Sequence, residues 1–257
     1  MISSDKAHTF IEGLSLEPPR VQRFEVNERG EQPSVTFRND DQAVAVGSQI
    51  AEFARNVPAE IRPQISNSIL LAQLAANKAV GDTAGTSAAW RESYQNVLFN
   101  TGWTFEGSSV GMQEIKENNL EVHKAIIPIL TAVLGPAVTA TALVTTVLNG
   151  LASMNQDTPW ITLFNRESRR ASVNQFQIGY VQAPGGAVPR MSTIFFELNV
   201  TGVVTQVLLF KFSSANGSLF HSHSDLSISP SLLADISDVI QRKVAAHAQT
   251  FIQGIEI

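Results

Sequence analysis

The sequence predicts an α+β protein: a single domain in which a mostly antiparallel sheet is layered between helices. Three stretches predict this class. Residues 194–212 read as two apolar strands, residues 125–156 contain no charged side chain, and residues 230–252 keep a helical spacing of apolar positions. Because an antiparallel strand that is apolar on both faces needs cover on both, we expect helices on either side of the sheet.

The two arms of the 194–212 stretch differ in their patterning. Apolar side chains alternate from Ile194 to Val200, which is the period of a strand buried on one face. A tight turn is expected at Thr201-Gly202. Residues 204–212 place apolar side chains on both faces, so this second arm predicts a strand inside the core.

Composition narrows the class of protein. With 44% apolar and 16% charged residues, the 257-residue chain can bury a large core, and its net charge of −5 gives no indication of nucleic-acid binding. The absence of cysteine excludes disulfides, thiolate catalysis and zinc–thiolate sites. Residues 1–16 lack an apolar signal-peptide core, so no secretory signal is expected.

The first part of the chain predicts a hairpin followed by two helices. Residues 21–39 alternate around a polar turn, which favours a peripheral β-hairpin. An Asn-Asp-Asp sequence then offers the N-cap of a helix that stops at Pro58. A second apolar stripe runs over residues 61–81, so residues 40–81 predict a helical hairpin.

Residues 82–117 allow two interpretations. Trp90, Tyr94 and Val97 could line a short helix. The apolar triplets on either side of Asn100-Thr101-Gly102 could instead form a small β-hairpin. Both interpretations stay open at the level of the sequence.

The charge-free run predicts a second helical hairpin, within residues 119–153. Gly135 can end one helix and Pro136 can begin the next, while Pro128 must lie in the first turn or bend the first helix. A bilayer span needs about 20 apolar residues, and this run is long enough, but the Gly-Pro break and the many threonines favour a buried hairpin. A third interpretation is a buried hairpin that can leave the core.

Strands are expected mainly within residues 158–228. Besides the apolar stretch described above, the candidates are residues 160–164, 176–180 and 220–228. Pro-Gly-Gly and Asn-Gly turns join them, and sequential strands with short turns predict an antiparallel meander.

The last helix is expected over residues 230–252. Ser229 provides an N-cap, and Pro230 suits the first helical position. No linker or repeat divides the chain, so a single domain is expected to cover residues 1–257.

One cluster carries site-type residues. His221, His223 and Asp225 would share one face of a strand and could hold a metal ion or serve a hydrolase. An exposed polar strand face is the more common origin of such a cluster. No nucleophile elbow, dinucleotide fingerprint or phosphate loop is present, so an enzyme is the class with least support, and we expect no cofactor and no catalytic residue.

Three arginines form the densest basic cluster. Arg166, Arg169 and Arg170 are expected in a polar loop between two strands. Guanidinium groups bind phosphate oxygens well, so the three are candidates for contacts with lipid headgroups. A solvated loop is the alternative interpretation.

The order of these features resembles a known family. The resemblance rests on Trp160-Ile161, on Asn165 with a polar turn, on the alternating strand through Phe176 and Ile178, and on the glycine turn before the long apolar stretch. The charge-poor helical run just before Trp160 is also in the family's place. In these respects the chain resembles the Cyt-type cytolytic δ-endotoxins and the related bacterial virulence factors and fungal cytolysins.

The resemblance implies a three-layer α/β/α sandwich with helical hairpins on both faces of the sheet. It also implies a membrane-active protein without catalytic residues, released to act on the membrane of a target cell. Its partners would be membrane lipids and further copies of itself on the membrane, with no nucleic acid. The candidate membrane-interacting residues are Ile126, Ile127, Leu130, Val133, Ile194, Phe195, Phe196, Val203, Val207, Leu209 and Phe210. The alternative is a non-lytic protein of the same fold that holds a lipid or fatty acid.

Overall fold

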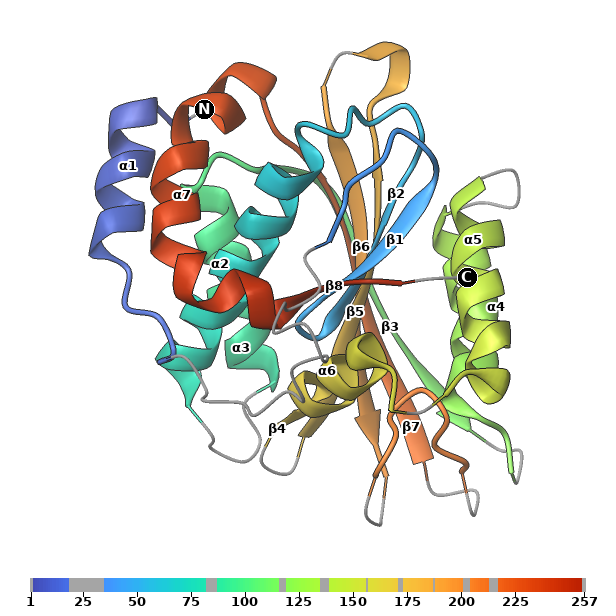
Figure 1. Ribbon diagram of the computed structural model, residues 1–257. Coiled ribbons are helices and arrows are strands. Elements are labelled where there is room, and N and C mark those ends of the chain that lie inside the picture. The colour runs from blue at the N-terminus through green and yellow to red at the C-terminus, as the bar shows by residue number, and fades with distance from the viewer. Residues whose placement is uncertain are drawn as a thin grey trace, which may run out of the picture.

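The computed structural model describes residues 2–18, 35–81, 87–115, 119–134, 139–155, 157–170, 173–186, 188–200, 204–212 and 217–255. It is a three-layer α+β domain, as expected. Helices α1, α2, α3 and α7 cover one face of a central sheet, here called the α3 face, and α4 and α5 lie on the other, the α4 face (Figure 1).

The described helices alternate with the strands instead of preceding them. The α-helices are α1 (Ser4–Gly13), α2 (Arg62–Val80), α3 (Ser87–Asn100), α4 (Val122–Leu134), α5 (Thr139–Gly150), α6 (Pro159–Ser168) and α7 (Pro230–Phe251). Short 3₁₀ turns, η1 and η2, occupy Leu151–Ser153 and Pro184–Gly186.

The described strands form one eight-stranded sheet in the order β3-β7-β6-β5-β2-β1-β8, with β4 also paired to β5. The parallel β2–β5 pair interrupts an otherwise antiparallel sheet, and β5, β6 and β7 form the expected meander. The strands are β1 (Gln42–Val46), β2 (Gln49–Phe53), β3 (Thr104–Ile115), β4 (Arg169–Arg170), β5 (Val173–Gln182), β6 (Arg190–Asn199), β7 (Gly217–Ser227) and β8 (Ile252–Gly254).

The helix expected before Pro58 is wrong, because this segment is the β1–β2 hairpin. Gly47 has a φ of 55° in the two-residue turn, a conformation that favours glycine. Every residue of both strands is buried. A strand buried on both faces shows no polar alternation, so its apolar residues also fit a helical spacing. The second predicted helix is confirmed as α2, and its helical partner is α3.

The open alternative in residues 82–117 is settled by α3 and β3. Trp90, Tyr94 and Val97 lie on the buried side of α3, so the helical interpretation is right for them. The hairpin interpretation is wrong, because the chain turns at Gly102 from a helix into the long strand β3.

Residues 160–164 are helical, so the strand expected there is wrong. Pro159 opens α6, and Trp160, Ile161, Leu163 and Phe164 are buried at the spacing of one helix face. A short apolar run fits both a strand and one side of a helix, which is why its period misleads.

The apolar stretch 194–212 is a strand in its first arm and an irregular segment in its second. β6 is confirmed, but it pairs with β5 and β7, so no edge of β6 is left for residues 204–212. The predicted turn at Thr201-Gly202 lies outside the described residues.

The remaining expectations concern the ends of the chain. The last helix is confirmed as α7, with Pro230 in its first turn. Ser229 has the extended backbone of an N-cap, but its hydroxyl lies 2.9 Å from that of Ser231 and makes no capping bond. Most of the hairpin expected in residues 21–39 lies outside the described residues, and residues 35–38 form no strand.

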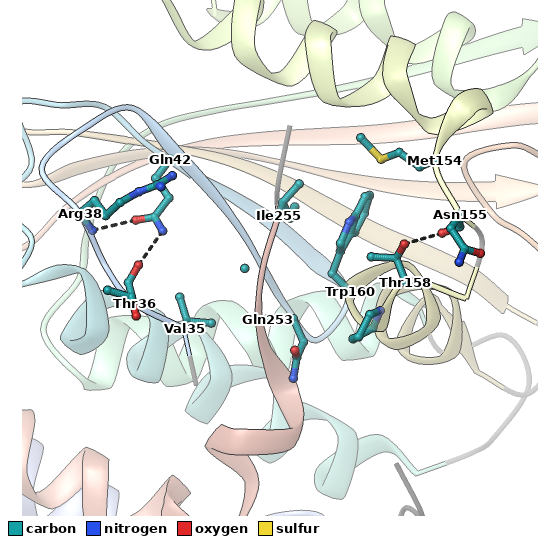
Figure 2. Close-up of a pocket in the computed structure, with 12 residues that line it drawn as sticks. Val35, Thr36, Arg38, Gln42, Met154, Asn155, Thr158, Trp160, Gln253 and Ile255 are labelled. Carbon is teal, nitrogen blue, oxygen red and sulfur yellow. Dashed lines mark hydrogen bonds between the residues drawn. The ribbon is translucent and has the colours of Figure 1, made fainter. Parts of the chain in front are cut away.

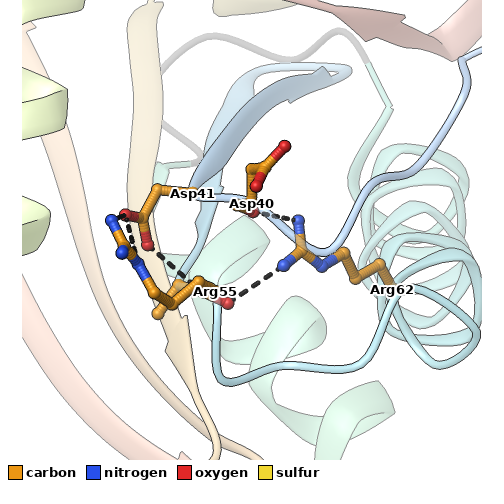
Figure 3. Close-up of polar contacts among 5 residues, drawn as sticks. Asp40, Asp41, Arg55 and Arg62 are labelled. Atoms are coloured by element: carbon orange, nitrogen blue, oxygen red, sulfur yellow. Dashed lines mark hydrogen bonds and ion pairs between the residues drawn. The ribbon is translucent and has the colours of Figure 1, made fainter.

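Arg62 ties α2 to both ends of the β1–β2 hairpin (Figure 3). Its buried guanidinium donates to the carbonyl oxygens of Val57, Asp40 and Ala54 at 2.9, 2.8 and 3.0 Å. It also lies 5.6 Å from the centre of the Phe53 ring. Burial lowers the pKa of Arg62, an effect that the nearby aspartates oppose.

Arg62→Met should therefore destabilise the fold strongly, because the carbonyl oxygens of Val57, Asp40 and Ala54 lose the guanidinium as a donor. We expect the free energy of unfolding to fall by about 2–4 kcal/mol, measured by urea titration. Arg55→Met is the matched control, because the Arg55–Asp41 ion pair is solvent-exposed on the arginine side and should contribute far less to stability. Equal losses in the two variants would contradict this role of Arg62.

Candidate functional site

The α4–α5 pair is the expected helical hairpin, uncharged from Ala125 onward and packed on the α4 face of the sheet (Figure 1). The Gly135-Pro136 break lies outside the described residues. Pro128 lies inside α4, beyond its first turn, and is exposed. Ala132, one turn further on, is exposed as well. The outer side of α4 beyond its first turn is therefore uncharged.

The candidate membrane residues of α4 divide between its two sides. Ile126 and Leu130 are fully buried, whereas Ile127 and Val133 are half-buried and pack against the edge of the core. Leu134 packs against the small cluster of Ala54 and Tyr180 beside the sheet. Each turn of α4 thus contributes both to the core and to the outer surface of this layer.

Residues 204–212, here called the connecting segment, pair with the chain that leads into α4. The amide nitrogens of Val122 and His123 donate to the carbonyl oxygens of Phe210 and Leu208 at 3.0 and 2.9 Å. Phe212 donates to the carbonyl oxygen of Leu120 at 3.0 Å. The sequence offered no signal for this pairing, because residues 120–123 and 208–212 lie far apart along the chain.

Charged side chains surround this junction. The carboxylate of Glu121 lies 3.0 Å from the ammonium of Lys124, 3.4 Å from that of Lys211 and 3.5 Å from Nε2 of His123. Lys124 contributes most to holding the pKa of Glu121 below its ordinary value. The base of α4 is thus held by both backbone bonds and charge.

His123 is the buried member of this cluster. Its Nδ1 lies 3.2 Å from the Leu208 carbonyl oxygen, and its side chain is 2% exposed. Burial lowers the pKa of the imidazole, while the Leu208 carbonyl and Glu121 partly oppose that effect. The folded state therefore favours neutral His123.

The other candidate membrane residues lie in different places. Ile194, Phe195 and Phe196 are buried in β6, near the middle of the sheet. Phe195 stacks on Trp90 of α3, while Phe196 stacks on Phe176 on the α4 face. In the connecting segment Val207 is buried and Leu209 and Phe210 are half-buried, and Val203 lies outside the described residues. The structure does not bring these residues into one surface.

The arginine cluster lies at the end of α6 and in β4, so the polar loop expected there is wrong. Arg166 contacts Glu167 and lies 5.2 Å from the Phe251 ring. Arg169 donates to the carbonyl oxygens of Asn165 and Val204 at 2.9 and 3.3 Å. Arg170 pairs through β4 with Val173 of β5. The first two guanidinium groups are thus engaged within the protein.

The histidine cluster lies on β7, facing the α4 side. Nε2 of His223 lies 3.1 Å from Oδ1 of Asp225, which also accepts from the Ser192 hydroxyl at 2.5 Å. Burial lowers the pKa of His221. Within the described residues no group of three or more His, Cys, Asp or Glu side chains is arranged to hold a metal ion.

A cavity of about 650 Å³ opens beside β8, at the end of the sheet away from β3 (Figure 2). Arg38, Trp160 and Gln253 are among the residues that line it. Two further cavities, one under α3 and one between α6 and the connecting segment, measure about 10 Å³ each. That volume is about what one water molecule needs, so neither can hold an acyl chain.

None of the described helices combines the length and the apolar character that a transmembrane crossing requires.

Comparison with known proteins gives structural likenesses alone. No protein-family model matches the sequence, and no curated protein matches it. A solved delta-endotoxin is 15% identical, with a TM-score of 0.40, over 83% of this chain and 91% of that chain. The activated Cyt2Ba monomer from Bacillus thuringiensis subsp. israelensis is 14% identical, with a TM-score of 0.39, over 71% and 97%. The Evf virulence factor is 15% identical, with a TM-score of 0.35, over 99% and 91%.

Acid should loosen the base of α4 through His123. The folded pKa of His123 lies below the unfolded value of 6.5. The stability that neutral His123 contributes is therefore complete above pH 6.5 and is lost as the pH falls through the folded pKa. His123→Gln should therefore lose less stability than the parent between about pH 7.5 and 5.5, measured by urea unfolding.

The control for this prediction is His8→Gln on α1. Its side chain lies 2.9 Å from the Asp235 carbonyl oxygen, away from the α4 junction. This variant removes a histidine without changing the α4 junction. If His123→Gln declined as steeply as the parent, the loss would have to come from other groups.

Proposed function

We propose that this protein is a membrane-active, cytolysin-like toxin or virulence factor that binds bilayers and permeabilises target cells without enzymatic chemistry. The observation that carries the proposal is the α4–α5 layer, whose sequence is uncharged from residue 125 to residue 156 although it forms an outer layer of the fold. The resemblance noted in the sequence agrees with this proposal.

An uncharged outer layer is unusual for a helix that faces water. Surface helices of globular proteins normally carry charged residues on their outer side. Here the exposed positions beyond the first turn of α4 include Pro128 and Ala132, and those of α5 include Thr146 and Asn149. A charged side chain placed in a bilayer costs about 2.5–3.5 kcal/mol, and this layer avoids that cost.

The short helices favour a position in the membrane interface. α4 has 13 residues and α5 has 12. At about 1.5 Å per residue, each is roughly 20 Å long, less than the roughly 30 Å of bilayer hydrocarbon. A helix that is too short to span the hydrocarbon can still lie along the interface with its apolar side buried.

Departure of this layer would uncover part of the α4 face of the sheet. Phe176, Ile178, Ile194 and Phe196 lie on that face and are buried, and Phe176 also contacts Phe164 of α6, which is not part of this layer. Their strands remain paired on both sides, which is the condition for backbone groups in hydrocarbon. The connecting segment is the hinge, because it holds α4 at one end through backbone bonds.

The alternative is a non-lytic lipid- or fatty-acid-binding protein of the same fold. The cavity of about 650 Å³ beside β8 favours this candidate, because its volume falls in the range of small-molecule sites. It lies between the start of α6 and the β8 end of the sheet, and no described residue of α3 or α4 lines it. A fatty acid that copurifies in native mass spectrometry, without leakage of vesicles, would support this alternative.

Dye release from liposomes tests the lytic proposal, and a disulfide tests the role of the layer. Because the chain has no cysteine, Ala54→Cys with Leu134→Cys introduces a single pair between the sheet and the end of α4. We expect leakage to be blocked when the pair is oxidised and to return on reduction. The two single-cysteine variants are the controls. No leakage by the parent protein across neutral and anionic vesicles at several pH values would overturn the proposal.

A charge on the outer side of α4 should weaken membrane binding without harming the fold. Ala132 is exposed, so Ala132→Glu should change stability by about 0.5 kcal/mol or less. We expect vesicle binding, measured by cosedimentation, to fall about tenfold or more, because the carboxylate must be desolvated. Ala132→Gln has nearly the same shape without the charge and should bind like the parent. Equal binding by both variants would place the contact surface elsewhere.

A further inference from the structure

The two ends of the sheet differ in exposure. At one end β8 is three residues long. At the other end β3 is 12 residues long and pairs with β7 on one side alone, among the described residues. Alternate residues of such an edge strand direct N–H and C=O groups away from the sheet, where another strand can pair with them.

Edge strands of monomeric proteins usually carry features that prevent this pairing. Lysine, proline and inward-pointing charges are common examples. The β3 sequence TFEGSSVGMQEI contains no proline and no basic residue. Its regular part follows a bulge between Phe105 and Gly107, so residues 107–115 form a continuous pairing surface.

Two large apolar side chains project from this strand. Val110 is 69% exposed and Met112 is 66% exposed. They lie opposite Ser222 and Phe220 of β7, on the α3 face. Two neighbouring apolar side chains at the free edge of a sheet form a surface that a partner strand can cover.

The strand is complementary to itself in one antiparallel register. If Gly111 of one copy lies opposite Gly111 of the other on a two-fold axis, residues 107–115 of the two copies pair along their whole length. Val110 then lies opposite Met112, and Ser109 lies opposite Gln113, so apolar faces apolar and polar faces polar. A shift that centres Val110 would instead place Ser108 opposite Met112 and would shorten the paired surface to residues 107–113.

We propose that β3 is a self-association edge, at which two copies of this chain join their sheets antiparallel about Gly111. The four apolar side chains of Val110 and Met112 from the two copies form the centre of the contact on the α3 face. The net charge of −5 on each copy opposes association, so added salt strengthens it. This inference does not rest on membrane activity.

Cysteine cross-linking tests the register, because the chain has no cysteine of its own. Residues directly opposite each other lie about 4.5–5.5 Å apart and diagonal neighbours about 7–8 Å, and a disulfide needs the shorter distance. A mixture of Val110→Cys and isotope-labelled Met112→Cys should therefore form mixed disulfides about tenfold faster than either variant alone.

The control is Val188→Cys mixed with Met112→Cys, because Val188 is exposed but lies between β5 and β6. Mixed disulfides no faster than in this control would overturn the proposal. Disulfides formed mainly between two copies of Val110→Cys would overturn the register.

Sedimentation velocity without lipid tests the association itself. The parent should form dimers that increase with concentration and salt, while Met112→Lys should weaken dimerisation about tenfold and Met112→Leu should preserve it. Both variants should keep the thermal midpoint of the parent, because the side chain is exposed. A parent that stays monomeric at about 0.1 mM would overturn the proposal. Leakage without dimers would contradict this inference alone, and dimers without leakage would contradict the proposed function alone.

Discussion

The fold depends on a sheet that is apolar on both faces. Consecutive residues of β6 show the constraint most directly, because Phe195 stacks on Trp90 of α3 and Phe196 stacks on Phe176 on the opposite side. Each fully buried aromatic or aliphatic side chain of this kind contributes about 1.5–3 kcal/mol. In water, both helical layers must therefore cover the sheet at the same time. A bilayer removes this requirement for one face, because hydrocarbon can replace a protein layer there.

The two layers are attached differently, which decides which of them can leave. On the α3 face buried polar groups cross the interface: Tyr94 donates to Gln49 of β2 at 3.0 Å, and Gln73 of α2 donates to the Val46 carbonyl oxygen at 2.8 Å. Separating that layer would strand buried hydrogen-bonding groups, each at a cost of about 1–3 kcal/mol. On the α4 face the described bonds of α4 to its surroundings lie at its first turn. The described contacts of α4 beyond that turn are apolar, which agrees with the proposal that this layer leaves the sheet about the connecting segment.

Sequence patterning predicted the elements that are covered on one side and failed for those buried on both. The stripes of α2, α4 and α7 and the alternation of β6 are one-sided, so their periods identified them. β1 and β2 are buried throughout, and the apolar run at the start of α6 is short. The sequences of these segments therefore fit a strand and a helix equally well. The connecting segment failed for another reason. Its apolar residues predict a strand, but β7 returns from later in the chain to take the free edge of β6. A local pattern holds no information on that competition.

The same limit applies to the candidate site. Apolar character and the family resemblance select residues 194–196 and 126–133 as candidates, whereas the fold buries the first set in the sheet and divides the second between core and surface. The exposed apolar pair Val110 and Met112 had no signal in the sequence, because two apolar residues among serines and glycines resemble a loop. Its position at a free edge matters for the membrane as well. An unpaired strand edge cannot enter hydrocarbon, and a second copy joined at β3 would supply the missing backbone partners. Pairing of two β3 edges would thus supply the backbone hydrogen bonds that a sheet needs when one of its faces contacts hydrocarbon.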